Sequence, residues 1–245
     1  MTLRFLVTRP EPDARATLER LAALDIEAVA APLMTRQTLD TGLPSAEGFA
    51  AMAITSTNAL RALADRGVLA GYSGLPLFAV GDRTAHEARS MGFSAVTSAS
   101  GAFADLAATI ALARVNGPIF YPAGRHLSAD LAHALAPQGI MVVTTEVYEM
   151  IAVAASPPAL SQMLKDDGKA HGVMLYSRRT AEIFCALTKT LPLEHRRYMP
   201  MLCLSEKVAE PLLEHHFARV LLADHPSEEA MMALALAFAR EQSEP

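Results

Sequence analysis

The sequence predicts an α/β protein with two parallel-sheet domains of duplicated origin, and three observations lead to this prediction. Short apolar runs alternate with amphipathic segments along the chain, which is typical of strands alternating with helices. Small and hydroxyl-bearing residues mark the points where an apolar run gives way to an amphipathic segment. The layout starts again after Asn116-Gly117-Pro118, so we expect the two halves to be copies of one unit. The natural ligand site of such a protein is a cleft between the domains.

The first half contains five apolar runs that fit buried strands. The predicted strands cover residues 3–8, 26–31, 52–55, 77–80 and 93–97. Pro10 and Pro12 break the chain after the first of them, before an amphipathic helix begins. The hydroxyls of Thr55, Ser56 and Thr57 suit the N-terminus of a helix over 58–66.

The second half repeats this layout. Its predicted strands cover residues 118–121, 140–147, 172–177, 201–206 and 217–223. Pro122-Ala123-Gly124-Arg125 is expected to form the turn after the first of these strands, with a helix following to about residue 136. Two stretches do not fit the repeat, 34–45 and 146–151, and both are interpreted as joints.

Composition narrows the class of protein. The chain has 245 residues and a net charge of −5, without interleaved aromatic and basic residues, which argues against a nucleic-acid partner. No apolar run approaches the roughly 18 residues of a membrane span, and Met1 to Pro10 does not resemble a signal peptide. Cys185 and Cys203 lie far apart within apolar runs, as buried thiols of a reducing compartment do. We therefore expect a soluble cytoplasmic protein.

Common motifs for cofactors and nucleophiles do not occur. The sequence has no G-x-G-x-x-G, Walker A or G-x-S-x-G pattern. His126 and His133 are interpreted as lacking a Cys or acidic partner at a ligand spacing, and His215-His216 fits a helix end, where imidazoles suit the dipole, better than a metal site. We expect neither a cofactor nor a metal ion.

Polar groups gather where the predicted strands end, which is where parallel α/β sheets bind ligands. Six of these strand-end positions are cationic, although a helix N-terminus disfavours a cation: Arg9, Arg83, Arg125, Arg178, Arg179 and Lys207. Each by itself fits an ordinary surface charge. Together, in an acidic protein, they favour a site for a polyanion such as a polycarboxylate or phosphate.

Short motifs spread over the whole chain identify a family. They are Leu6-Val7-Thr8-Arg9-Pro10, Thr55-Ser56 with Asn58-Ala59, Val80-Gly81 with Thr84-Ala85, Ser100-Gly101, Glu146-Val147-Tyr148-Glu149, and Tyr176-Ser177 leading to Thr180-Ala181. Each motif is weak, but their order and spacing are specific. With them the chain resembles the uroporphyrinogen-III synthases, which close the linear tetrapyrrole hydroxymethylbilane.

The resemblance implies a domain exchange that periodicity does not reveal. One domain would consist of residues 1–33 and 152–245, and the other of residues 36–148. Residues 34–35 and 149–151 would form a two-stranded connector, with the active-site cleft between the domains.

The resemblance also implies the reaction. The substrate loses its terminal hydroxyl, the azafulvene is attacked by the substituted carbon of ring D, and the spiro intermediate reopens and closes with ring D inverted. Water is lost and no cofactor is needed. The substrate would come from hydroxymethylbilane synthase by a transient hand-over. A monomer is expected, because no long apolar stripe calls for a partner.

Site residues follow from the same resemblance. Tyr148 matches the tyrosine thought to help the hydroxyl leave; on the residues alone it fits a packed hinge residue or a donor facing the cleft. The resemblance also implies that eight residues line the cleft: Thr55, Ser56, Gly81, Thr84, Ser100, Gly101, Gly124 and Ser177. The strand-end cations Arg9, Arg83 and Lys207 complete the expected set of substrate-binding residues.

The chain departs from the family pattern at two places. Lys207 or Val208 replaces a hydroxyl that some relatives carry, and Lys207 could supply a carboxylate contact instead. Asp25 stands where glycine is common, and an aspartate tolerates the left-handed backbone conformation that this position would need.

Two alternatives remain open at this point. A non-catalytic two-domain module that binds an anionic small molecule would have the same architecture, because a fold does not fix a function. An enzyme with another acidic substrate would use the same cleft. Turnover of hydroxymethylbilane separates the first alternative from the synthase, and the effect of changing Tyr148 separates the second.

Overall fold

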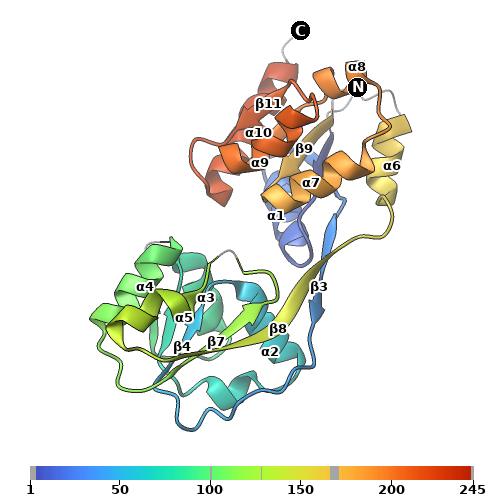
Figure 1. Cartoon of the computed structure of the whole chain (residues 1–245). Coiled ribbons are helices and arrows are strands. Elements are labelled where there is room, and N and C mark those ends of the chain that lie inside the picture. Colours follow the sequence, from blue (N-terminus) through green and yellow to red (C-terminus); the bar gives the residue numbers. More distant parts are fainter. Residues whose placement is uncertain (1–3, 100, 128, 166–170, 244–245) are drawn as a thin grey trace. The chain divides into compact units, whose positions relative to one another are not determined.

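The chain folds into two compact units, each with its own β-sheet, in which parallel pairings predominate. A computed structural model describes residues 4–99, 101–127, 129–165 and 171–243. Unit 1 consists of Met1–Thr35 and Ile151–Pro245, and unit 2 is Arg36–Met150. Figure 1 shows that each sheet has helices packed against it. Across the described ranges, none of the helices combines the length and the apolar character that crossing a membrane requires.

Two strands carry the chain from one unit into the other. They are β3 (Met34–Thr38) and β8 (Val142–Ala152), which are neighbours in one sheet. The Leu39 N–H donates to the Val147 carbonyl, and the Val153 N–H donates to the Leu33 carbonyl. Because the partner numbers rise in one strand as they fall in the other, β3 and β8 are antiparallel.

Unit 1 has a five-stranded sheet of order β11-β10-β9-β1-β2, in which all pairings are parallel. Its strands are β1 (Arg4–Val7), β2 (Glu27–Ala30), β9 (His171–Leu175), β10 (Met201–Cys203) and β11 (Val220–Leu222). Its helices are α1 (Asp13–Ala22), α6 (Pro158–Lys165), α7 (Arg178–Leu187), α8 (Leu193–Tyr198), α9 (Glu206–Glu214) and α10 (Glu228–Ser243). Helices α6, α7 and α9 bury one face of the sheet, and α1 and α10 bury the other.

Unit 2 has a six-stranded sheet of order β3-β8-β7-β4-β5-β6. Besides β3 and β8, its strands are β4 (Ala51–Ile54), β5 (Leu77–Ala79), β6 (Val96–Ser98) and β7 (Ile119–Gly124). Its helices are α2 (Thr57–Asp65), the 3-10 helix η1 (Leu69–Tyr72), α3 (Asp82–Ser90), α4 (Phe103–Leu112), α5 (Leu131–Leu135) and the 3-10 helix η2 (Ala136–Gln138). Helices α2 and α3 bury one face, and α4 and α5 bury the other.

The two sheets share one strand order, and this is the structural form of the repeat in the sequence. Each strand of one sheet corresponds to its predicted repeat in the other when the orders are written β2-β1-β9-β10-β11 and β8-β7-β4-β5-β6. Each unit therefore takes a strand-helix-strand segment from one half of the sequence and three strands from the other half. The predicted α/β class with two parallel sheets is confirmed.

Several local predictions hold, whereas β6, β10 and β11 are shorter than predicted and two predictions after β7 differ in kind. Ser56 and Ser177 cap α2 and α7, with their side chains accepting from the backbone N–H groups of Asn58 and Thr180. Asp25 has a φ of 57°, so the left-handed conformation is indeed carried by an aspartate. The predicted turn at Pro122 is wrong: β7 continues to Gly124 because Pro122 and Ala123 pair with β8.

The second discrepancy concerns the helix after β7. It was expected to run to about residue 136, but α5 covers only Leu131–Leu135 and begins at the Asp130 cap, whose side chain accepts from the His133 N–H. The Asp130 carboxylate caps the first turn, so α5 begins at Leu131, later than predicted. A 3-10 turn that contains Pro137 follows α5 and ends at Gly139, which has a left-handed backbone.

Gly172 in β9 leaves no room for a side chain, which gives a test of the packing in unit 1. A Cβ at this position would lie 2.6 Å from Cε1 of Phe5, whose ring is fully buried against Phe238. We expect Gly172→Ala to lower the free energy of unfolding by about 2 kcal/mol, measured by urea unfolding. Gly74→Ala is the control, because its Cβ would meet nothing within 4 Å. Equal unfolding midpoints for the two variants would contradict this packing.

An ion pair that fixes β3 to α2 makes stability depend on pH. Asp65 accepts hydrogen bonds from Arg36 and Thr38, and its side chain is half exposed. These bonds, and chiefly the one from Arg36, hold the pKa of the Asp65 carboxyl below its ordinary value of 3.8. A lowered folded-state pKa adds stability above the ordinary pKa and loses it as pH falls through the folded-state pKa. We expect Asp65→Asn to cost about 0.5 kcal/mol at pH 7, and the difference from the unchanged protein to shrink below pH 3.8. A cost that is the same at pH 7 and in acid would contradict the assignment.

Candidate active site

The strand order locates the candidate site within each unit. In sheets of order 2-1-3-4-5, ligands bind at the carboxyl ends of the strands, where the strand order reverses. In unit 1 this point lies between β1 and β9, and in unit 2 between β7 and β4. Most of the predicted site residues follow these strands and their outer neighbours, so each unit has its own set.

In unit 2, the phenol of Tyr148 lies directly against Gly124. A Cβ on Gly124 would lie 2.7 Å from Cζ and 3.0 Å from the hydroxyl oxygen of Tyr148. The strand pairing shows how this arises: Ala123 pairs with Glu146 and Gly124 pairs with Tyr148, so Val147 is the extra residue of a β-bulge. Val147 is fully buried, and the bulge places Tyr148 opposite Gly124 in the register. Gly124 is needed here for close approach.

The residues that follow β4 present hydroxyl groups at the same edge. The Thr55 hydroxyl is 2.9 Å from the hydroxyl of Tyr121, a buried residue of β7. Ser56 caps α2, and the side chain of Asn58 in the first turn contacts the Met150 sulfur at 3.7 Å. Thr55 and Ser56 are both half-buried, so their polar atoms are within reach of a ligand.

The ends of β5 and β6 approach each other through two glycines. A Cβ on Gly81 would lie 3.2 Å from the Gly101 Cα, and the Gly101 N–H donates to the Val80 carbonyl over 2.8 Å. Gly81 itself has an extended backbone, whereas Gly101 has a φ of +106° that favours glycine. Thr84 is buried in the first turn of α3, and Arg83 beside it is exposed. Ser100, also expected at the site, lies outside the described residues.

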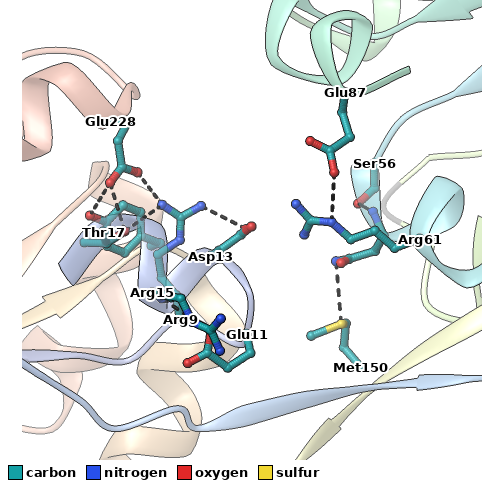
Figure 2. Close-up of polar contacts among 12 residues, drawn as sticks. Arg9, Glu11, Asp13, Arg15, Thr17, Ser56, Arg61, Glu87, Met150 and Glu228 are labelled. Atoms are coloured by element: carbon teal, nitrogen blue, oxygen red, sulfur yellow. Dashed lines mark hydrogen bonds and ion pairs between the residues drawn. The ribbon is translucent and has the colours of Figure 1, made fainter. Parts of the chain in front are cut away.

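In unit 1, Arg9 is the centre of a buried polar network (Figure 2). Its guanidinium pairs with Asp13 at 3.0 Å and with Glu228 at the start of α10, and it donates to Thr17 at 3.2 Å. Thr17 in turn donates to Glu228 at 2.9 Å. Two carboxylates thus already compensate the charge of Arg9, whose side chain is only 9% exposed.

Tyr176, directly after β9, completes this network. The Arg9 guanidinium lies 4.3 Å from the centre of its ring, a cation–π contact. Burial, and after it the negative charge of Glu228, raise the pKa of the Tyr176 phenol. A protonated phenol therefore remains next to the ion pairs over the whole physiological range.

The other predicted residues of unit 1 are exposed. Ser177 caps α7, with its hydroxyl 2.7 Å from that of Thr180. Lys207 lies in the first turn of α9, and among the described residues no carboxylate forms an ion pair with it.

At least three of the six strand-end cations bind carboxylates of their own unit within the described ranges. Besides Arg9, Arg125 binds Glu146 at 3.1 Å and Glu149 at 2.5 Å, and Arg178 binds Glu182 at 3.0 Å and also Glu210. The hydrogen bond that Arg125 donates to Glu146, and after it the negative charge of Glu149, raise the pKa of Arg125. The excess of positive charge that the sequence suggested is thus smaller than six. Most of the hydrogen-bond donors at these strand ends are neutral. They are side-chain hydroxyls and the backbone N–H groups in the first turns of α2, α3, α7 and α9.

Two hollows lie away from these strand ends. One, of about 700 Å³, is lined by residues of α1 and β2, including Asp25 and Glu27. The other, of about 620 Å³, lies where β7 and β8 begin, near Gly117 and Met141. Neither contains a predicted site residue. In the described ranges, no group of three or more His, Cys, Asp or Glu side chains could hold a metal ion.

The sequence pattern did not single out Tyr121, Glu228 or Tyr176 as candidate site residues, although the structure places them in contact with predicted ones. A tyrosine in an apolar strand is ordinary core composition, so the sequence carries no signal for Tyr121. Glu228 lies 219 residues from Arg9 and looks like the usual acidic residue of a first helical turn.

Comparisons with known proteins agree with this architecture. A family model described as uroporphyrinogen-III synthase HemD matches residues 15–233. Uroporphyrinogen-III synthetase from Helicobacter pylori 26695 aligns with a TM-score of 0.66 and 18% identity, covering 97% of this chain and 99% of that one. A mutant uroporphyrinogen III synthase from the extremely thermophilic bacterium Thermus thermophilus aligns with a TM-score of 0.55 and 14% identity, covering 99% and 100%. No curated protein sequence matches the chain significantly.

At such identities the two structures show the fold, whereas the family model spans most of the sequence. The resemblance found in the short motifs is confirmed, and the chain belongs to the uroporphyrinogen-III synthase family.

Proposed function

We propose that this protein converts hydroxymethylbilane to uroporphyrinogen III, with loss of water and inversion of ring D. The observation that carries the proposal is the family match over residues 15–233, together with the bulge that holds Tyr148 against Gly124. A phenol fixed on a bulge at a strand end is a positioned donor, as a leaving hydroxyl requires.

Tyr148 is the proposed catalytic residue. Its O–H would protonate the terminal hydroxyl of the substrate as the C–O bond breaks, so that the oxygen leaves as water. The N–H of the same pyrrole ring would return a proton to the phenolate, which gives the neutral azafulvene. The azafulvene that remains is attacked by the substituted carbon of ring D. The free substrate also closes by itself to the uninverted isomer I, so the protein contributes mainly by holding ring D in the geometry that leads to the spiro intermediate.

Substrate binding is proposed to use many neutral donors and few charged groups. The acetate and propionate groups of the substrate would meet Thr55, Ser56, Gly81, Thr84, Ser100, Gly101, Gly124 and Ser177 through hydroxyl and backbone N–H groups. Lys207 and Arg83 are exposed at strand ends and would add cationic contacts. Arg9 is proposed to act with its two carboxylate partners, shaping the end of β1 around the ligand.

The remaining parts of the proposal concern context. The protein would work as a monomer in the cytoplasm, without a cofactor, and would receive its linear tetrapyrrole by transient hand-over from hydroxymethylbilane synthase. The test is an assay coupled to that synthase and porphobilinogen, with the oxidised products separated by isomer. Isomer III is the expected product. Folded protein that gives only isomer I would leave a binding module as the function.

Removing the Tyr148 hydroxyl tests the catalytic assignment. We expect Tyr148→Phe to lower kcat by about tenfold to a hundredfold, below the full range for a general acid because positioning supplies much of the rate. The share of isomer I should rise as the uncatalysed closure competes. The control is Tyr198→Phe, which changes a tyrosine that is 76% exposed. Unchanged kcat and isomer ratio in Tyr148→Phe would refute this role.

Gly124 tests whether the position of the phenol matters as well as its presence. The methyl group of Gly124→Ala would lie 2.7 Å from the Tyr148 ring, so the ring has to move. We expect kcat to fall by about tenfold or more with the phenol still present, since a shift of about 1 Å can cost a hundredfold. Combining Gly124→Ala with Tyr148→Phe should add little to the single changes. If the two losses multiply, Gly124 does not act through Tyr148.

A further inference from the structure

Tyr121 is a buried phenol whose hydroxyl reaches the candidate site of unit 2. Its side chain belongs to the core under α4 and α5, and the residue is only 2% exposed. The hydroxyl nevertheless lies 2.9 Å from the Thr55 hydroxyl, at the carboxyl end of the neighbouring strand β4. Within the part of the chain that the structure describes, Thr55 is the one hydrogen-bond partner of this phenol.

The direction of this hydrogen bond follows from burial and chemistry. A buried O–H that finds no acceptor is costly, and the proton of Tyr121 has Thr55 within reach. A phenol is also the stronger donor of the two, and burial raises the pKa of Tyr121 further, which keeps it protonated. Thr55 is half-buried, so its own proton can point out of the protein. If Tyr121 donates and Thr55 accepts, the Tyr121 proton has an acceptor and the Thr55 proton is left for a further acceptor.

A hydrogen bond donated by Tyr121 to Thr55 fixes the direction in which the Thr55 hydroxyl can itself donate. An O–H that already accepts a hydrogen bond is polarised and becomes a better donor towards a further acceptor. The acceptor that suits such a group is a carboxylate, because a hydrogen bond to a charged oxygen is the strong kind. Thr55 directly follows β4, and Gly124 is the last residue of β7, the strand that pairs with β4. Since the Tyr148 phenol lies against Gly124, the Thr55 hydroxyl and this phenol both lie near the carboxyl ends of neighbouring strands.

We propose that Tyr121 is a positioning residue, which donates to Thr55 and thereby directs the Thr55 hydroxyl to a carboxylate of the substrate. The proposal rests on the proposed function for the identity of the carboxylate. It assigns Tyr121 to substrate affinity and leaves the chemical step to Tyr148, because Tyr121 does not touch the reacting atoms.

The experiment is a double-mutant cycle on the full chain. Thr55→Val removes the donor and keeps the shape of the side chain, and we expect KM to rise about tenfold. Tyr121→Phe removes only the phenol hydroxyl and should raise KM about threefold with kcat nearly unchanged. In the Thr55→Val background, Tyr121→Phe should change KM by less than about twofold, because the two act as one unit.

Tyr72→Phe is the matched control. Tyr72 is a buried tyrosine of the same unit whose hydroxyl donates to the Pro44 carbonyl, away from the strand ends. Its loss removes a buried hydrogen bond and should lower the melting temperature without changing KM. If Tyr121→Phe raises KM no more than Tyr72→Phe, or multiplies with Thr55→Val, Tyr121 is a core residue and the proposal fails.

A binding measurement separates this proposal from the proposed function. The same four proteins of the cycle are titrated with uroporphyrin III, a stable porphyrin with eight carboxylates, and followed by porphyrin fluorescence anisotropy. The expected rise in Kd follows the KM pattern, whether or not the unchanged protein produces isomer III. Binding that is equally tight in all four would overturn the assignment of Tyr121, while absence of isomer III with an intact binding cycle would overturn only the proposed function.

Discussion

The pairing of β1 with β9 is the constraint on which unit 1 depends. β1 is an inner strand, placed between β2 and β9, and its residues pair in parallel with residues 171–174, far along the chain. The Thr8 hydroxyl continues the contact by donating to the Met174 carbonyl at 2.7 Å. An inner strand cannot be left out without exposing both core faces, so the N-terminal segment has to pair with the C-terminal part of the chain. For the same reason the chain has to pass between the units twice, in β3 and in β8.

Local compensation of charge determines what the strand ends can offer. Arg9, Arg125 and Arg178 bind carboxylates of their own unit, so their positive charges are largely used within the protein. Hydroxyls and backbone N–H groups are left as the numerous donors. Such groups impose direction on a carboxylate, whereas an exposed ammonium binds it as a point charge. This suits a reaction in which the conformation of a flexible polycarboxylate decides the product.

Two close approaches set the shape of the site in unit 2, and both depend on a missing Cβ. Gly81 lets the loop at Gly101 come within van der Waals distance, and Gly124 accommodates the Tyr148 ring. Gly81 and Gly124 do not have a positive φ, so close packing, and not backbone conformation, accounts for a glycine at these two positions. From inside the core, the buried Tyr121 brings its hydroxyl to 2.9 Å from the half-buried Thr55 hydroxyl.

The sequence by itself determined the class of fold, the internal repeat and the local signals that begin and end helices. Alternating periodicity reports which segments form strands and helices, and Ser56, Ser177 and Asp25 act through hydrogen bonds and dihedral angles close to their own positions. The tertiary structure decided the partners. The bulge at Val147, the pairing of Arg9 with Glu228 and the contact between Tyr121 and Thr55 join segments from 24 to 219 residues apart. Local pattern does not encode such partners, because they follow from which faces are buried together and which charges then need compensation.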